Sequence, residues 1–163
     1  VVTLLLGDQL VNPNMTTQND GRTALMLAAQ NGHAPVVTLL LGDQLVNPNM
    51  TTQYGRTALM IAAMNGHAPV VTVLLADERV DPNMADQNGF TALAFAAREG
   101  HAPVVTMLLA DERVNPNMIT TETGVTALIL AAKNGHAPVV TLLLADERVN
   151  PNMTMQNLSL IHI

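Results

Sequence analysis

Apolar positions recur along the chain in two short clusters per unit, and the unit repeats every 34 or 35 residues. In one copy the clusters are Leu59–Ala63 and Val70–Leu75. The second cluster is apolar at positions i, i+1, i+4 and i+5, which places one apolar stripe along a helix. The pattern therefore predicts a short first helix over Thr57–Asn65 and a second helix that begins near Pro69.

Local signals mark the ends of these predicted helices. Gly55 can supply a positive φ angle just before the first helix, and Thr57 is a suitable N-cap. Gly66 is expected to end the first helix in the left-handed conformation. Pro69 suits the first turn of the second helix, where a backbone N–H would have no helical partner.

The copies divide the chain into stacked units. We assign residues 1–17 to a partial unit with only a second helix and its loop, and complete units to 18–51, 52–85, 86–120 and 121–154. A unit of this length cannot bury its apolar face alone, so at least three must stack. Residues 155–163 begin a further unit, but Leu158–Ile163 departs from the pattern. We expect this tail to be non-native sequence on a fragment of a longer array.

Composition restricts the classes of fold and function. The aromatic residues are only Tyr54, Phe90 and Phe95, so the core must consist of Leu, Val, Ala and Met, which favours packed helices. A net charge of −6 argues against nucleic-acid binding. The chain has no cysteine and no 18-residue apolar run. We therefore expect a cytoplasmic chain without a membrane partner.

The third unit carries a family resemblance. From Asp86 to His101 it reads Asp-Gln-Asn-Gly-Phe-Thr-Ala-Leu-Ala-Phe-Ala-Ala-Arg-Glu-Gly-His. This resembles the ankyrin repeat, D-x-x-G-x-T-P-L-H-x-A-A-x-x-G-H, and Asp81-Pro-Asn stands where that family has Asp-Val-Asn. The resemblance implies an all-α ankyrin solenoid of helix-turn-helix units with extended β-turn loops. It also implies a non-catalytic protein–protein interaction module that needs no cofactor.

Two positions depart from the family pattern in every complete unit. Alanine replaces the proline of Thr-Pro-Leu-His. The histidine of the same motif is replaced by Met26, Met60, Ala94 and Ile129. The hydrogen bond between threonine and histidine that the family often makes is therefore lost, and we expect an apolar contact in its place.

Three rows of identical residues are candidates for chemistry. The first contains His33, His67, His101 and His136. Stacked helices lie about 8–10 Å apart, whereas zinc needs its ligand nitrogens at about 2.0–2.1 Å. One histidine per unit cannot share an ion, so we predict no metal site. The resemblance implies that these histidines bond backbone groups of the turn.

The other two rows also have a structural interpretation. The methionines Met15, Met50, Met84, Met118 and Met153 are expected to pack beneath the loops, although a soft-metal or oxidation-sensing stripe is the alternative. The Asp-Glu-Arg triplets begin at Asp77, Asp111 and Asp146. Their paired carboxylates could carry acid–base chemistry, but the adjacent arginine favours a solvated edge that neutralises itself. The Asn-x-Thr sequons at Asn14, Asn49 and Asn152 are interpreted as chance products of the repeated loop.

In ankyrin proteins partners usually bind across the turn tips and the exposed side of the first helices. Carried over to this chain, that face holds Arg22, Gln30, Asn31, Gln53, Tyr54, Arg56, Met64, Asn65, Gln87, Asn88, Phe90, Arg98, Glu99, Val125, Lys133 and Asn134. These positions differ between the copies, while scaffold positions barely change. Arginine and aromatic residues are typical interface anchors.

We therefore expect a partner protein with acidic or mixed chemistry on this concave face, and no small-molecule substrate. Two alternatives remain open. The near-identity of the units favours a structural spacer in a long array. The second alternative is that the chain is a recruiting or regulatory arm of an enzyme whose catalytic domain lies outside this chain.

Overall fold

The computed structural model describes residues 11–153, in which the regular secondary structure consists of α-helices joined by turns and loops. The helices are α2 (Ala24–Gln30), α3 (Ala34–Leu41), α4 (Ala58–Met64), α5 (Ala68–Leu75), α6 (Ala92–Glu99), α7 (Ala102–Ala110), α8 (Ala127–Lys133) and α9 (Ala137–Ala145). Between residues 11 and 153 the only β-type pairings are two isolated bridges, Thr16–Thr23 and Ile119–Thr126. Most of the predicted partial unit 1–17 lies outside the described residues. The whole of the predicted tail 155–163 also lies outside them.

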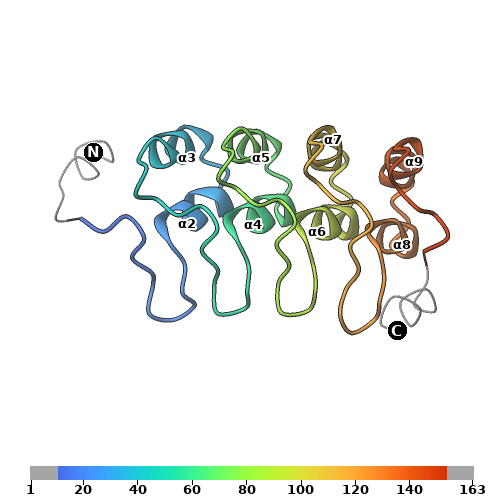
Figure 1. Cartoon of the computed structure of the whole chain (residues 1–163), viewed down its shortest axis with the longest axis horizontal. Coiled ribbons are helices and arrows are strands. Elements are labelled where there is room, and N and C mark those ends of the chain that lie inside the picture. The colour runs from blue at the N-terminus through green and yellow to red at the C-terminus, as the bar shows by residue number, and fades with distance from the viewer. Residues whose placement is uncertain (1–10, 154–163) are drawn as a thin grey trace.

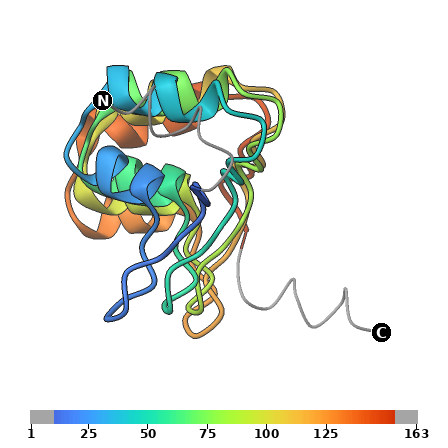
Figure 2. The same cartoon turned by 90° about the vertical axis from the view of Figure 1, so that its left-hand side faces the viewer.

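The helices form a solenoid of four antiparallel pairs, as predicted (Figure 1). The first helices α2, α4, α6 and α8 pack on one another in one layer, and the second helices α3, α5, α7 and α9 do so in another. Seen along the stack, the hairpin loops project from one side of the first-helix layer (Figure 2). None of the described helices combines the length and the apolar character that a membrane span requires.

The predicted helix-end signals are confirmed in the second unit. Gly55 and Gly66 have φ angles of 79° and 75°. Thr57 is the N-cap of α4, and its Oγ1 accepts a hydrogen bond of 3.3 Å from the backbone N–H of Met60. Pro69 stands in the first turn of α5. Short local signals therefore set where each helix starts and stops.

The core lies between the two helix layers and consists of small and aliphatic side chains. The predicted positions Leu59, Ile61, Ala62 and Ala63 are all buried, and so is the stripe of the second helix except for the half-buried Leu75. Each fully buried aliphatic side chain contributes roughly 1.5–3 kcal/mol.

The side chains that replace the family histidine are apolar contacts, as expected, in three of the four units. Met60 is 1% exposed and Ala94 4%. Met26 is also buried, and its Sδ accepts a 3.5 Å contact from the backbone N–H of Thr23. Ile129 is 37% exposed, so the expectation is wrong for α8, where Ile129 instead lines a surface pocket.

The histidine row is structural, and its hydrogen bonds join neighbouring units. His67 Nε2 lies 2.9 Å from the carbonyl oxygen of Gln30, and His101 and His136 make the equivalent contacts at 3.1 and 2.9 Å. The ring also lies against the turn glycine of the preceding unit. A Cβ atom on Gly66 would be 2.8 Å from His101 Nδ1. Glycine is thus required there by both its positive φ and the ring beside it.

An asparagine in each loop also joins neighbouring units. The Asn49 side chain donates to the Arg79 carbonyl at 2.7 Å and accepts from the backbone N–H of Asp81 at 2.9 Å. Asn14 makes the same pair of bonds to the next loop. The sequon side chains of Asn14 and Asn49 are therefore part of the scaffold.

The methionine row follows the packing prediction only in part. Met50 and Met84 are half-buried and pack against the core. Met15 is 70% exposed, so the packing prediction is wrong at that position. It does not lie beneath its loop as its counterparts do.

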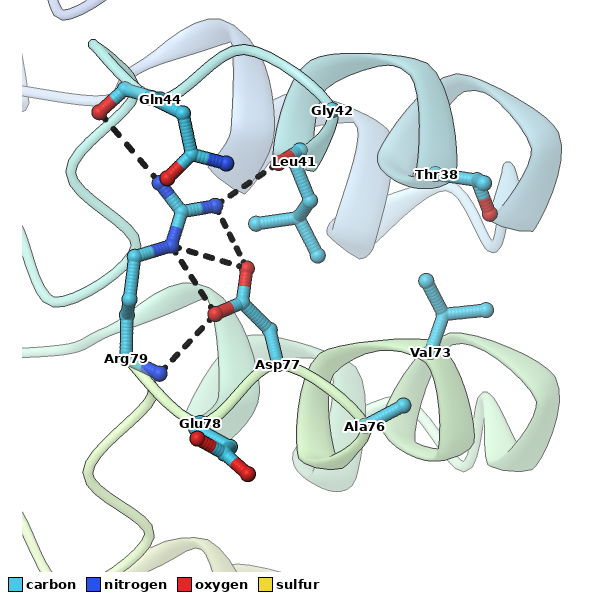
Figure 3. Close-up of a pocket in the computed structure, with 9 residues that line it drawn as sticks. All are labelled: Thr38, Leu41, Gly42, Gln44, Val73, Ala76, Asp77, Glu78 and Arg79. Carbon is cyan, nitrogen blue, oxygen red and sulfur yellow. Dashed lines mark hydrogen bonds and ion pairs between the residues drawn. The ribbon is translucent and has the colours of Figure 1, made fainter.

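The Asp-Glu-Arg triplets neutralise themselves, as expected, but they are more than a solvated edge (Figure 3). Asp77 and Arg79 form an ion pair at 2.6 Å, and Asp77 Oδ1 also accepts from the backbone N–H of Arg79 at 2.9 Å. The Arg79 guanidinium then donates to four carbonyls of the preceding unit. The two shortest bonds are to Leu41 at 2.7 Å and Val46 at 3.2 Å, and the longer ones are to Gln44 at 3.4 Å and Asp43 at 3.5 Å. Each arginine therefore clamps its unit to the one before it.

The clamp repeats in the next two units and changes the acidity of its carboxylates. Arg113 Nη2 donates to the Leu75 carbonyl at 2.8 Å, and Arg148 Nη2 donates to the Leu109 carbonyl at 2.6 Å. The hydrogen bonds from the paired arginines hold the pKa values of the three aspartates below their usual range. These are Asp77, Asp111 and Asp146.

Candidate functional site

The concave face is built by two positions in every unit. One follows the hairpin glycine and precedes the N-cap threonine, and the other lies at the C-terminal end of the first helix. The hairpin position holds Arg22, Arg56, Phe90 and Val125. The helix-end position holds Gln30, Met64, Arg98 and Lys133. Because the glycine turn and the threonine cap fix the backbone on both sides, these side chains are held at the same place in each unit.

Successive hairpins are joined by backbone hydrogen bonds at their tips, which keeps the face continuous. The N–H of Gln87 donates to the Tyr54 carbonyl at 3.2 Å, and the N–H of Thr121 donates to the Asn88 carbonyl at 2.9 Å. The Gln87 side chain adds a bond of 2.7 Å to the Gln53 carbonyl. The hairpins therefore hold the site side chains on a connected frame.

Two pockets lie along this face, and both are lined mainly by predicted site residues. A pocket of about 360 Å³ lies between the third and fourth units. It is lined by Asn88, Phe90, Arg98, Thr120, Glu122, Thr123, Val125, Ile129, Leu130, Lys133 and Asn134. A pocket of about 120 Å³ lies between the first and second units. It is lined by Arg22, Gln30, Thr52, Tyr54, Arg56, Ile61, Met64 and Asn65.

An arginine–aromatic cluster, composed of Tyr54, Arg56, Phe90, Phe95 and Arg98, joins the second and third units. Arg56 Cζ lies 5.9 Å from the Tyr54 ring centroid and 5.2 Å from that of Phe95. Arg98 Cζ lies 5.1 Å from the centroids of both Phe90 and Phe95. The two phenylalanine rings are 5.2 Å apart. Phe95 is 1% exposed, so it forms the floor beneath the two guanidinium groups.

Three of the carboxylates on this face, Asp20, Asp86 and Glu99, are bonded within the protein. Asp86 is 7% exposed and accepts from the backbone N–H groups of Asn88 and Phe90, both at 2.9 Å. Glu99 accepts from Arg98 Nε at 2.8 Å. The hydrogen bond from Thr17, together with nearby Arg22, lowers the pKa of Asp20. Glu122 lines the rim of the larger pocket and is exposed.

Four of the predicted site residues lie outside the two pockets, namely Asn31, Gln53, Gln87 and Glu99. The Asn31 side chain donates to the Leu27 carbonyl at 2.8 Å, and Asn65 and Asn134 cap their own helices in the same way. Asn31 lies outside the pockets and Asn65 and Asn134 line them, and each amide nitrogen already donates to its own helix. We expect these asparagines to contribute less to binding than the arginines and aromatic residues.

Phe95 is a member of the cluster that the sequence prediction missed, although it was counted among the aromatics. It lies four residues after the capping threonine, where the other copies have Leu27, Ile61 and Leu130. Because the equivalent positions of the other copies are aliphatic, this position is typical of a buried core residue. The signal that could have identified it is that this one copy is aromatic where its counterparts are aliphatic.

Two larger hollows lie elsewhere, between the second helices and the Asp-Glu-Arg loops. They measure about 650 and 780 Å³, and Figure 3 shows the first. Their arginines and aspartates already bond one another and the preceding unit. No group of three or more His, Cys, Asp or Glu side chains that could hold a metal ion occurs within residues 11–153.

Comparison with known proteins agrees with this repeating architecture. A family described as "Ankyrin repeats (3 copies)" matches residues 1–86 and again 73–155. A comparison with curated proteins found no match. The two family matches together cover nearly the whole chain, and the observed helix pairs repeat with the same period. The chain therefore belongs to the ankyrin-repeat family.

Proposed function

We propose that this chain is a non-catalytic module that binds a partner protein through its concave face. Ankyrin repeats generally mediate protein–protein interactions. The observation that carries the proposal here is the arginine–aromatic cluster, which spans two units beside a pocket of about 360 Å³. Arginine and aromatic side chains dominate binding energy at protein interfaces.

A structural spacer is the second candidate, because the arginine clamp recurs in three units with the same geometry. We call the row of these clamps, Asp77–Arg79, Asp111–Arg113 and Asp146–Arg148, the ridge. That repetition stabilises stacking and needs no partner. The spacer alternative does not account for the concave face, which we also call the groove, where Tyr54 is 54% exposed and lies 5.9 Å from the guanidinium carbon of Arg56. A recruiting arm of an enzyme would use the same face and is a special case of binding.

The test is a selection of binders against the whole chain from a display library of random linear peptides and small randomised scaffold proteins. Affinities of the selected binders are then measured for two variants. The first is Arg56→Ala/Phe90→Ala/Arg98→Ala, which truncates three side chains of the arginine–aromatic cluster. The second is Arg113→Gln/Arg148→Gln, which removes two positive charges from the ridge. Circular dichroism first establishes that both variants are folded at the temperature used.

The proposal predicts that most binders lose at least tenfold in affinity for the cluster variant, which corresponds to about 1.4 kcal/mol. The same binders should retain their affinity for the ridge variant. Binders that are spread evenly over the surface, or that respond to the ridge variant, would overturn the assignment of the concave face.

A further inference from the structure

The arginines of this chain fall into two groups by how their nitrogens are used. Arg79 uses Nε and both Nη atoms within the protein, on Asp77 and on backbone carbonyls of the preceding unit. Arg56 is different. Its Nε is buried without a hydrogen bond among the described residues, and the Asp86 carboxylate lies 3.6 Å away. The Arg56 Nε is therefore closed to a partner, but within residues 11–153 its Nη atoms donate no hydrogen bond, whereas those of Arg79 do.

Arg98 has a similar arrangement. Its Nε is bound to Glu99 at 2.8 Å, and within residues 11–153 neither of its Nη atoms donates a hydrogen bond. Arg56 and Arg98 both stack near the buried ring of Phe95, at 5.2 and 5.1 Å. A guanidinium that is held by stacking has lost part of its freedom before a ligand arrives, which lowers the entropic cost of binding.

Positive charges recur along the groove, and each arginine among them has a carboxylate neighbour. Arg22, Arg56, Arg98 and Lys133 supply one cation in each unit along this face. Asp20, Asp86 and Glu99 are ion-paired with Arg22, Arg56 and Arg98, and both Glu99 and Glu122 are exposed. The chain as a whole carries a net charge of −6. An acidic ligand can therefore bind here only through the N–H donors of these cations that are not already used, among them those of Arg56 and Arg98.

The pocket beside Arg98 adds an apolar element. Phe90, Val125 and Ile129 line it, and the cations Arg98 and Lys133 stand at the same pocket. A volume of about 360 Å³ is at the lower end for ligand pockets and suits one large side chain better than a folded surface. The groove therefore contains a pocket that can hold an apolar side chain and that has positively charged groups at its edge.

We propose that the occupant of this groove is a linear peptide segment in which carboxylate side chains flank one large apolar residue. The carboxylates bind the free Nη edges of Arg56 and Arg98, and the apolar side chain fills the pocket lined by Phe90, Val125 and Ile129. Planar carboxylates match the guanidinium fork with two parallel hydrogen bonds. This inference rests on the proposed function, because it names the partner chemistry of the same face.

Carboxylates fit this site better than phosphate groups do. A phosphate brings a charge of about −1.5 to −2 at neutral pH, and Glu99 and Glu122 lie beside the same cations. Each of the two arginines has one free edge, which one carboxylate satisfies. Domains that recognise phosphorylated peptides use several arginines that converge on one phosphate. Among the described residues of this site, Arg56 and Arg98 belong to different units and do not form such a cluster.

The test uses the linear peptide that is most enriched in the selection described above, labelled with fluorescein and titrated by fluorescence polarisation. A second peptide carries Gln for every Glu and Asn for every Asp. A third carries phosphoserine at those positions. Each is titrated against the native chain, against Arg56→Gln/Arg98→Gln, and against Arg113→Gln/Arg148→Gln. The titrations are run at low and at high NaCl concentration.

We expect the amide peptide to bind the native chain at least tenfold more weakly than the acidic peptide. The difference should largely vanish on Arg56→Gln/Arg98→Gln and persist on the ridge variant. Affinity for the acidic peptide should also fall as NaCl rises. Selected peptides that depend on the concave face but contain no acidic residues would overturn this inference and leave the proposed function standing. A peptide that binds only when phosphorylated would also overturn it, and the absence of any face-dependent binder would overturn both.

Discussion

Arg79 Nη2 lies 2.7 Å from the carbonyl oxygen of Leu41, which is 38 residues earlier in the chain. Leu41 is the last residue of α3, so the bond satisfies a carbonyl at the end of the preceding helix. Asp77 holds the guanidinium in place through an ion pair at 2.6 Å. This relationship makes the Asp-Glu-Arg triplet a joint between units.

Removing this joint should destabilise the array. Arg79→Gln eliminates several charge-assisted hydrogen bonds to partly buried groups, and we expect the free energy of unfolding to fall by about 1.5–3 kcal/mol. The matched control is Glu78→Gln, because Glu78 is exposed on the same loop and such changes usually stay within about 0.5 kcal/mol. Urea denaturation followed by circular dichroism measures both. Equal effects of the two substitutions would show that the clamp contributes no more than an exposed surface charge.

The same joint should make stability depend on acid. Arginine donors lower the pKa of Asp77, Asp111 and Asp146 in the folded chain, while unfolded aspartate titrates near 3.9. The unfolded state therefore binds more protons as pH falls. The stabilisation is fully present above about pH 4 and is lost as pH falls through the lower, folded pKa values. Denaturation midpoints between about pH 6 and pH 2 should fall less steeply for the Asp77→Asn/Asp111→Asn/Asp146→Asn variant than for the native chain. An unchanged acid dependence would contradict this assignment.

A pair of glycines separates backbone strain from the packing between units. Gly66 and Gly135 have φ angles of 75° and 76°, so alanine is strained at both by about 1–2 kcal/mol. A Cβ at Gly66 would lie 2.8 Å from the His101 ring, whereas nothing lies within 4 Å of one at Gly135. We expect Gly66→Ala to destabilise the chain by about 1–3 kcal/mol more than Gly135→Ala.

Adding His101→Ala to Gly66→Ala distinguishes the ring contact from other causes. The ring substitution alone removes the 3.1 Å bond to the Met64 carbonyl and should be destabilising. In the Gly66→Ala background it should cost much less, because it also removes the clash. Thermal denaturation of the four chains in this cycle measures the coupling. Strictly additive effects would show that His101 does not constrain Gly66.

Much of the fold could be predicted because its signals are local. Thr57, Gly66 and Pro69 each act on the few residues beside them, and the structure confirms all three. The apolar stripe of α5 could also be predicted, since the spacing of Val70, Val71 and Leu74 within one helix decides which face is buried.

The contacts between units could not be predicted in the same way. Arg79 and His67 bind backbone carbonyls that lie 37 or 38 residues away, and no residue type marks a carbonyl as an acceptor. The nearest visible partner of Arg79 was Asp77, which suggested a pair that neutralises itself in solvent. Phe95 was not predicted as a site residue for the same reason, since its contact with Arg56 arises only when the units stack.

The most direct test of the account is hydrogen-exchange mass spectrometry of the native chain with and without the most enriched selected binder. The account predicts slower exchange on binding in the hairpin around Gln53–Arg56, in the hairpin around Gln87–Phe90 and at the C-terminal end of α6. Exchange in α5, α7 and the Asp-Glu-Arg loops should stay unchanged. Protection confined to the second helices and the Asp-Glu-Arg loops would contradict the central claim that the concave face binds the partner.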